Sequence, residues 1–154
     1  AFGNGWQYPE LFGRVGAFSP SLWLSADNRD ANAVQATRIA HALIDAGASM
    51  PRPGLFFGVG TNEETDDRDG DGVIDVLDDT RDLIEGWIAA DGTTRKGLRQ
   101  LGYSANIDHA LRSNRVDVAL YLLDGGRHDQ RSWARMLPVF LQWGYPPASR
   151  VPVN

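Results

Sequence analysis

The sequence predicts an α/β fold, in which helices flank a parallel β-sheet. Three short apolar runs, each followed by a turn signal, alternate with segments whose apolar residues recur at helical spacing. Strands in that alternation pair in parallel, because a helix returns the chain to the starting end of the sheet. The 154 residues, 42% hydrophobic and 23% charged, suit one folded unit and exclude a disordered chain.

The three apolar runs are interpreted as buried strands. They end at Ser-Pro-Ser, at glycine and at Asp-Gly-Gly, all of which favour turns. The predicted strands cover residues 14–18, 55–59 and 116–123. In a parallel sheet, functional residues gather in the loops that leave the carboxyl ends of the strands.

Helical spacing predicts the other elements. The first helix has Asn28 or Asp30 as its cap and ends before Gly47, and the second ends near Gly92. Pro138 is expected to kink or restart the third. The three apolar stripes are Ala36, Ile39, Ala40, Leu43 and Ile44; Leu83, Ile84, Trp87 and Ile88; and Trp133, Met136, Leu137, Phe140 and Leu141. Residues 1–13 are expected to contain the end of a helix, stopped by Pro9, and a turn, and a short helical stretch is expected over residues 93–101.

The net charge of −5 is concentrated in one segment. Ten of the twenty acidic residues lie between Glu63 and Asp82, with only Arg68 and Arg81 among them. This local excess favours a cation site over a uniformly acidic surface. The basic residues are scattered, so no nucleic-acid surface is predicted, and no apolar run reaches the ~18 residues of a membrane helix. The chain has no cysteine, which excludes disulfide and thiolate chemistry.

Residues 67–78 have the spacing of an EF-hand calcium loop. Carboxylates occupy positions 1, 3, 5, 9 and 12 of this segment, and glycine occupies position 6. Ile74 is expected to anchor the loop to the core. The predicted calcium ligands are Asp67, Asp69, Asp71, the Val73 carbonyl, Asp75 and Asp78. The alternative is a solvated acidic turn, in which the five carboxylates would repel one another.

The setting of this loop is unusual for an EF-hand. No helix is predicted before it, a helix is expected after Asp79, and the sequence has no second copy. We therefore expect a structural calcium site inserted over residues 66–79 of another fold, instead of a paired sensor or a dockerin module. A lone loop should bind calcium weakly, near ~10⁻⁴–10⁻³ M, which favours an extracytoplasmic (periplasmic or secreted) location.

The loops after the second and third strands carry a carboxylate and a histidine. Glu63 ends Gly-Thr-Asn-Glu after the second strand, and His128 ends Gly-Gly-Arg-His after the third. This is the chain order of the last two members of the Ser–Asp/Glu–His triad in α/β-hydrolases. In such a triad the carboxylate orients the imidazole, which is the general base for the serine. Spacing alone leaves open a surface or capping histidine.

Three stretches strengthen this interpretation. They are Tyr-Pro-Glu-Leu-Phe-Gly-Arg-Val-Gly-Ala-Phe-Ser-Pro-Ser-Leu-Trp (8–23), Gly-Thr-Asn-Glu (60–63) and Gly-Gly-Arg-His-Asp with the later Trp133 (125–133). Together they resemble an esterase family of the α/β-hydrolases that includes feruloyl and acetyl xylan esterases, enterochelin-type esterases, S-formylglutathione hydrolase and mycolyltransferases. The likeness spans most of residues 1–145. It implies that residues 1–154 form the C-terminal half of a single α/β-hydrolase domain acting on small esters.

The resemblance also implies roles for individual residues. His128 takes the position of the catalytic histidine. Glu63 takes that of the triad acid, with Glu64 or Asp66 as alternatives. Trp23 matches an aromatic position near the acyl pocket, and its alternative role is core packing.

The sequence departs from this family in two respects. The calcium loop is not a general family feature, and there is no Gly-x-Ser-x-Gly nucleophile elbow. The nucleophile and the oxyanion hole are therefore expected upstream of Ala1, and the N-terminal half of the same enzyme or a homo-oligomer partner is expected to complete the site. The alternative is a non-catalytic, calcium-binding interaction domain on a degenerate hydrolase scaffold.

Five other polar or aromatic residues receive weaker interpretations. Ser19 and Ser21 lack the elbow glycines and are interpreted as loop residues. His41 lies off its apolar stripe and is expected to be solvated. His109 lies in a polar loop, residues 103–115, with no evident partner. Trp133 is expected to pack behind the histidine loop.

Overall fold

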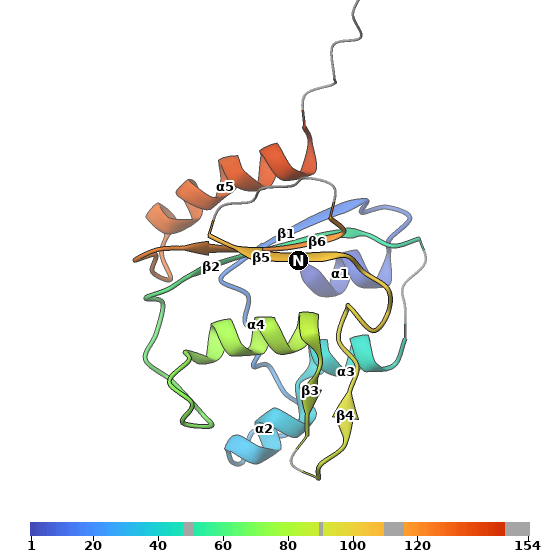
Figure 1. Cartoon of the computed structure of the whole chain (residues 1–154), viewed down its shortest axis with the longest axis vertical. Helices are drawn as coiled ribbons and strands as arrows, with labels where there is room; N and C mark the ends of the chain where they lie inside the picture. Colours follow the sequence, from blue (N-terminus) through green and yellow to red (C-terminus); the bar gives the residue numbers. More distant parts are fainter. Residues whose placement is uncertain (48–50, 90, 110–115, 147–154) are drawn as a thin grey trace, which may run out of the picture.

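The computed structural model describes residues 1–47, 51–89, 91–109 and 116–146. Four parallel strands form one sheet in the order β1-β2-β6-β5. They are β1 (Arg14–Phe18), β2 (Gly54–Gly60), β5 (Ala105–Asp108) and β6 (Val118–Leu123). Helix α5 (Gln130–Gly144) covers one face, and α1 (Phe2–Gln7), α3 (Ile39–Asp45) and α4 (Asp75–Glu85) lie on the other (Figure 1). The predicted α/β class, with helices on both sides of a parallel sheet, is confirmed.

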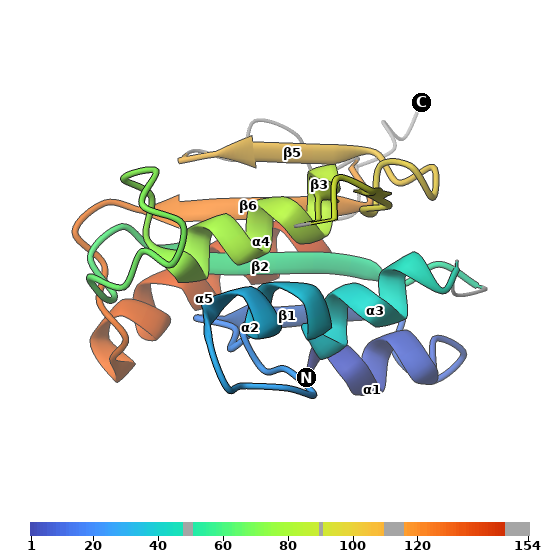
Figure 2. The ribbon, with the colours of Figure 1, turned by 90° about the horizontal axis from the view of Figure 1, so that it is seen from below.

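The core divides at the sheet because successive side chains of a strand point to opposite faces. Phe56 packs with Ala119 and Trp143 beneath α5, whereas Phe57 belongs to the larger cluster beneath the helices of the other face. Every residue of β2 is buried, as expected for a central strand. Figure 2 shows β2 and β6 side by side between the edge strands β1 and β5.

Strand β5 is absent from the sequence-based prediction, which assigned residues 103–115 to a polar loop. The strand has only four residues, Ala-Asn-Ile-Asp, and no apolar run. It forms because Ala105 to Asp108 pair in parallel with β6, from Ala105 opposite Val118 onward. The remainder of that segment, residues 110–115, lies outside the described residues.

The helix expected around residues 36–44 is divided into α2 (Ala31–Thr37) and α3. Asp30 is the cap of α2, since its Oδ1 accepts a hydrogen bond of 2.9 Å from the Ala33 amide. The break lies at Arg38, whose backbone is extended at ψ 121° and whose side chain is buried in ion pairs with Asp79 and Asp82. The apolar stripe of residues 36–44 did not predict that the Arg38 guanidinium would be buried.

The helical prediction for residues 83–101 is wrong beyond Glu85. Helix α4 ends there, and Gly86 adopts φ 83°, a left-handed conformation that ends the helix. A Cβ at Gly86 would lie 2.7 Å from the Arg95 carbonyl oxygen, so only glycine fits. The chain then forms a small antiparallel hairpin of β3 (Trp87–Ile88) and β4 (Thr94–Arg95).

Helix α5 continues through Pro138 and does not restart there. Its buried residues include Met136 and Trp143, one on each side of the proline, so packing against the sheet holds both halves of the helix. No helix in the described part of the chain combines the length and apolarity that crossing a membrane requires.

Candidate active site

Glu63 is held at the carboxyl end of β2. Its Oε1 accepts hydrogen bonds from the Gly60 amide, at 2.5 Å, and from Ser19 Oγ, at 2.8 Å. Its side chain is only 1% exposed. The other oxygen, Oε2, has no hydrogen-bond partner and lies 3.5 Å from His128 Nδ1. The buried carboxylate is therefore fixed by one oxygen and directed at the imidazole by the other.

Parallel pairing of β2 with β6 brings the glutamate and histidine loops together. The Asn62 amide donates to the Gly126 carbonyl at 2.9 Å, and the Gly125 amide donates to Thr61 Oγ1 at 2.9 Å. A Cβ at Gly60 would lie 2.4 Å from the Gly126 carbonyl group, so the loops approach closely enough to require glycine. Contact between residues 63 and 128 follows from the strand order.

The histidine loop is fixed at the start of α5. Asp129 caps the helix by accepting from the Ser132 amide at 2.8 Å, and Ser132 Oγ accepts from the Arg127 amide at 2.8 Å. Trp133 packs edge-on against His128, with ring centroids 5.4 Å apart. Its expected position behind the histidine loop is confirmed. The His128 side chain remains 56% exposed, which leaves it open to an incoming group.

Ser19 is a member of this site that the sequence interpretation missed. Its hydroxyl donates to Glu63 and accepts a 2.7 Å hydrogen bond from Trp133 Nε1. Ser19 does lie in the loop after β1, as predicted, but its hydrogen bonds to Glu63 and Trp133 were not predicted. The signal was its place at the end of a parallel strand, at the same sheet edge as Glu63 and His128.

The contacts of the two alternative acids lead to the start of α4. Glu64 Oε1 accepts a 2.7 Å hydrogen bond from the Val76 amide at the start of α4, and burial raises the pKa of this carboxyl. The Asp66 carbonyl accepts from the Asp75 amide at 2.8 Å. Among these three carboxylates, Glu63 is the one within ion-pair distance of His128.

Trp23 is 49% exposed and borders a hollow that also includes Glu64 and Arg68, so it is not packed in the core. A mostly apolar cavity of about 590 Å³ instead adjoins Ser19 and Trp133. Its other walls include Phe18, Leu22, Leu24 and Leu43.

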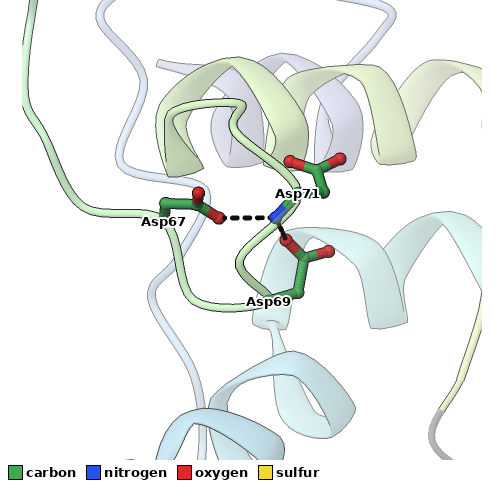
Figure 3. Close-up of side chains that lie close together, drawn as sticks. All are labelled: Asp67, Asp69 and Asp71. Atoms are coloured by element: carbon green, nitrogen blue, oxygen red, sulfur yellow. Dashed lines mark hydrogen bonds between the residues drawn. The ribbon is translucent and has the colours of Figure 1, made fainter.

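The first half of the acidic loop has converging carboxylates. Oxygen atoms of Asp67, Asp69 and Asp71 lie within 4.8 Å of one another (Figure 3). Asp67 accepts from the amides of Gly70 and Gly72, at 2.8 and 2.9 Å, and the Gly72 bond is the main cause of the lowered pKa of the Asp67 carboxyl. Both glycines have positive φ, at 76° and 89°, so the turn depends on them. The turn thus brings together three of the six predicted ligands.

The second half of the loop is only partly directed at this cluster. Asp75 is the first residue of α4 and binds Arg68, through the Arg68 amide at 2.8 Å and through the guanidinium at 3.5 Å. Burial, followed by repulsion from neighbouring carboxylates that include Asp69 and Asp71, raises the pKa of Asp78 to about 6. A cation bound among Asp67, Asp69 and Asp71 would offset the part of this repulsion that comes from Asp69 and Asp71. Ile74 packs against the core, as expected of an anchor.

The expectation for His41 is wrong. The side chain is 1% exposed, its Nε2 lies 2.9 Å from the Asp79 carbonyl oxygen, and it packs edge-on against Trp87. Burial and the Arg38 charge lower its pKa to about 3, so the ring is neutral. The helix break at Arg38 turns this residue inward, which the unbroken stripe could not predict.

The expectation that His109 has no partner is also wrong. Its Nδ1 lies 2.9 Å from Asp124 Oδ1, and both side chains are largely exposed. This pair joins the end of β5 to the end of β6. It could not be foreseen while β5 was unrecognised.

No family model, no curated protein and no solved structure matches this chain in the comparisons with known proteins. The interpretation of the site therefore depends on its own residues.

Proposed function

We propose that these residues are part of a serine carboxylic-ester hydrolase and carry its triad acid and histidine. The observation that carries the proposal is the arrangement of Glu63, which is buried, held through one oxygen and directed at His128 Nδ1 through the other. Residues 1–154 would then be the C-terminal half of an α/β-hydrolase domain. A serine from the N-terminal half, or from a homo-oligomer partner, would supply the nucleophile.

Each residue has a defined task in this mechanism. The Glu63 carboxylate accepts a hydrogen bond from Nδ1–H of His128, and this tautomer leaves Nε2 unprotonated and basic. Nε2 takes the serine proton as the hydroxyl attacks the ester carbonyl, and Glu63 stabilises the imidazolium that results. Nε2 then returns the proton to the departing alcohol. The exposure of His128 supports access of substrate from solvent.

We further propose a structural calcium ion held by Asp67, Asp69, Asp71, the Val73 carbonyl, Asp75 and Asp78. Calcium would supply charge neutralisation and rigidity but no chemistry to the ester. Asp67 follows Glu63 by four residues, and both lie on the connection between β2 and α4. Cation binding would therefore restrict the motion of the β2–α4 connection, which carries Glu63. Weak binding of this kind suits an extracytoplasmic compartment.

The test is the esterase activity of the complete protein on p-nitrophenyl acetate. His128→Ala should lower kcat by about 10³-fold or more, because a triad without its base retains little activity. The matched control is His109→Ala, which removes another exposed histidine paired with a carboxylate. Equal activity of the two variants would contradict the proposal. Calcium binding without esterase activity would favour the non-catalytic interaction domain.

A further inference from the structure

We propose that Ser19 is a positioning residue that holds the triad acid in place for His128. This inference rests on the proposed hydrolase function. Ser19 follows β1 and lies 44 positions before Glu63 in the sequence, but its hydroxyl contacts the Glu63 carboxylate. Its role would be to fix the rotamer of the carboxylate and, through it, the tautomer of the imidazole.

The direction of the hydrogen bonds at Ser19 follows from their chemistry. The Trp133 indole nitrogen can only donate, so Ser19 Oγ accepts that bond. The single hydroxyl hydrogen is then free for Glu63 Oε1, which lies 2.8 Å away. That hydrogen is thus directed at Glu63, the proposed acid, and not at His128, which is the general base of the proposed triad. Ser19 is accordingly a support for the acid and not a nucleophile.

Two donors on Oε1 leave Oε2 for the histidine. Ser19 Oγ and the Gly60 amide both bind Oε1, whereas Oε2 has no hydrogen-bond partner and faces His128 Nδ1. Hydrogen bonds to a charged group are stronger than those between neutral groups, so this arrangement defines one carboxylate rotamer. Loss of the Ser19 hydroxyl would leave only the Gly60 amide on Oε1.

The backbone conformation of Ser19 is one that favours glycine, which supports a specific role for the serine hydroxyl. Its φ of 48° is the single positive value at a non-glycine residue in the described part of the chain. The residue is buried, and its amide donates to the Gly58 carbonyl at 2.8 Å, so the conformation is fixed by the end of the sheet. Glycine would fit this backbone better, yet serine occupies it. Strained residues of this kind gather at functional sites.

Trp133 contacts both Ser19 and His128. Its indole N–H binds Ser19, and its ring packs against His128. Trp133→Phe keeps an aromatic ring beside the histidine but removes the donor that orients the Ser19 hydroxyl. Its matched control is Trp143→Phe, because Trp143 lies further along the same helix, α5, and its Nε1 is buried without a hydrogen-bond partner.

The test is the tautomer of neutral His128, measured by ¹⁵N NMR of the complete protein labelled at histidine nitrogen. The native protein should show the Nδ1–H form. Ser19→Gly, Ser19→Ala and Trp133→Phe should shift His128 toward Nε2–H and lower kcat about 10- to 100-fold, with KM little changed. Trp143→Phe should change neither. Ser19→Gly also relieves the backbone, so it should keep the native melting temperature while losing the tautomer.

The outcomes separate this inference from the proposed function. A native Nδ1–H tautomer that persists in Ser19→Gly and Trp133→Phe would overturn the role of Ser19 and leave the Glu63–His128 pair intact. A native Nε2–H tautomer would overturn the pair itself, and the role of Ser19 with it. A loss of kcat that only follows a lowered melting temperature would make Ser19 a structural residue.

Discussion

The guanidinium of Arg38 and the carboxylate of Asp79 form an ion pair with no solvent exposure on either side chain. The same carboxylate oxygen also accepts from Arg68, which is the second residue of the acidic loop. Asp79 lies one helical turn after the start of α4. This carboxylate therefore joins the α2–α3 junction to the proposed calcium loop, and it explains why a chain with an apolar stripe breaks its helix at residue 38.

Asp79→Ala is expected to destabilise the protein by about 3–5 kcal/mol, because it leaves a buried guanidinium without its main partner. Urea unfolding of the two proteins at one pH and one calcium concentration measures the difference. Glu85→Gln is the control on the same helix, since the Glu85–Arg99 pair is more than 40% exposed on both sides. It should change stability by about 0–1 kcal/mol. Similar effects of the two variants would contradict a special role for the buried pair.

Calcium is expected to stabilise the complete protein. At 100-fold excess over its dissociation constant, the free energy of unfolding should rise by about 2.7 kcal/mol. EDTA should lower both the melting temperature and the activity, and calcium should restore them better than magnesium, which demands a stricter octahedral geometry.

Asp71→Asn should abolish the calcium response and leave the His128 tautomer unchanged. The control is Glu10→Gln, which removes an exposed carboxylate outside the loop. If calorimetry detects no calcium binding at millimolar concentrations, residues 67–78 are only an acidic surface turn.

The choice of Glu63 as the acid is tested by comparing neighbouring variants. Glu63→Gln should lower kcat about 10⁴-fold, since an amide stabilises neither the required tautomer nor the imidazolium. Glu64→Gln should leave kcat within a few-fold of the native value, because Glu64 binds the Val76 amide instead of the histidine. A larger loss in Glu64→Gln would reassign the acid.

The elements predicted correctly are those whose local sequence and tertiary setting agree. The strand at residues 55–59 is apolar throughout and occupies the centre of the sheet. Strand β5 has no such signal, and only its pairing with β6 makes it a strand. Two helix predictions failed because tertiary contacts or backbone geometry outweighed apolar periodicity. The buried Arg38–Asp79 ion pair accompanies the helix break at residue 38, and Gly86, with its positive φ, ends α4 before the hairpin at Trp87.

The candidate site was partly predictable for a related reason. Sequence motifs identify functional residues that lie near one another in the chain. The proximity of Glu63 and His128 could also be predicted, because their loops follow two strands that pair in parallel. The contacts of Ser19 depend on a tryptophan 114 residues away, which no local pattern encodes. The apolar cavity beside Ser19 likewise combines side chains from β1, α3 and α5.

Residues 1–154 alone are expected to be poorly stable and inactive. Strand β1 is an edge of the sheet, and the apolar cavity lies beside its carboxyl end, so a partner would cover both. Without a nucleophile, hydrolysis of p-nitrophenyl acetate should not exceed that of the His128→Ala control, and addition of the N-terminal half should restore it. A well-folded monomer in sedimentation would contradict the expected instability, and turnover by this polypeptide alone would show that the nucleophile had been misplaced.

Buried His41 is expected to make stability fall on acidification. Its pKa is about 3 in the folded protein and near 6.5 in the unfolded chain, so between these values the unfolded chain binds one more proton. The slope of this contribution is at most about 1.4 kcal/mol per pH unit, and stability is lost as the pH falls below 6.5. Burial and the Arg38 and Arg68 charges lower this pKa, whereas the hydrogen bond to the Asp79 carbonyl raises it.

His41→Gln isolates this contribution, because glutamine can still donate to the Asp79 carbonyl but does not titrate. Urea unfolding from pH 7.5 to 5.0 should give a flatter pH dependence for His41→Gln than for the native protein. Carboxyls with raised pKa values, such as that of Asp82, change stability in the opposite sense, but they are common to both proteins and cancel in the difference. The control is His109→Gln, which makes the same substitution at a largely exposed histidine. Parallel curves for the native protein and His41→Gln would mean that the ring titrates normally and that the packing around Arg38 opens to water.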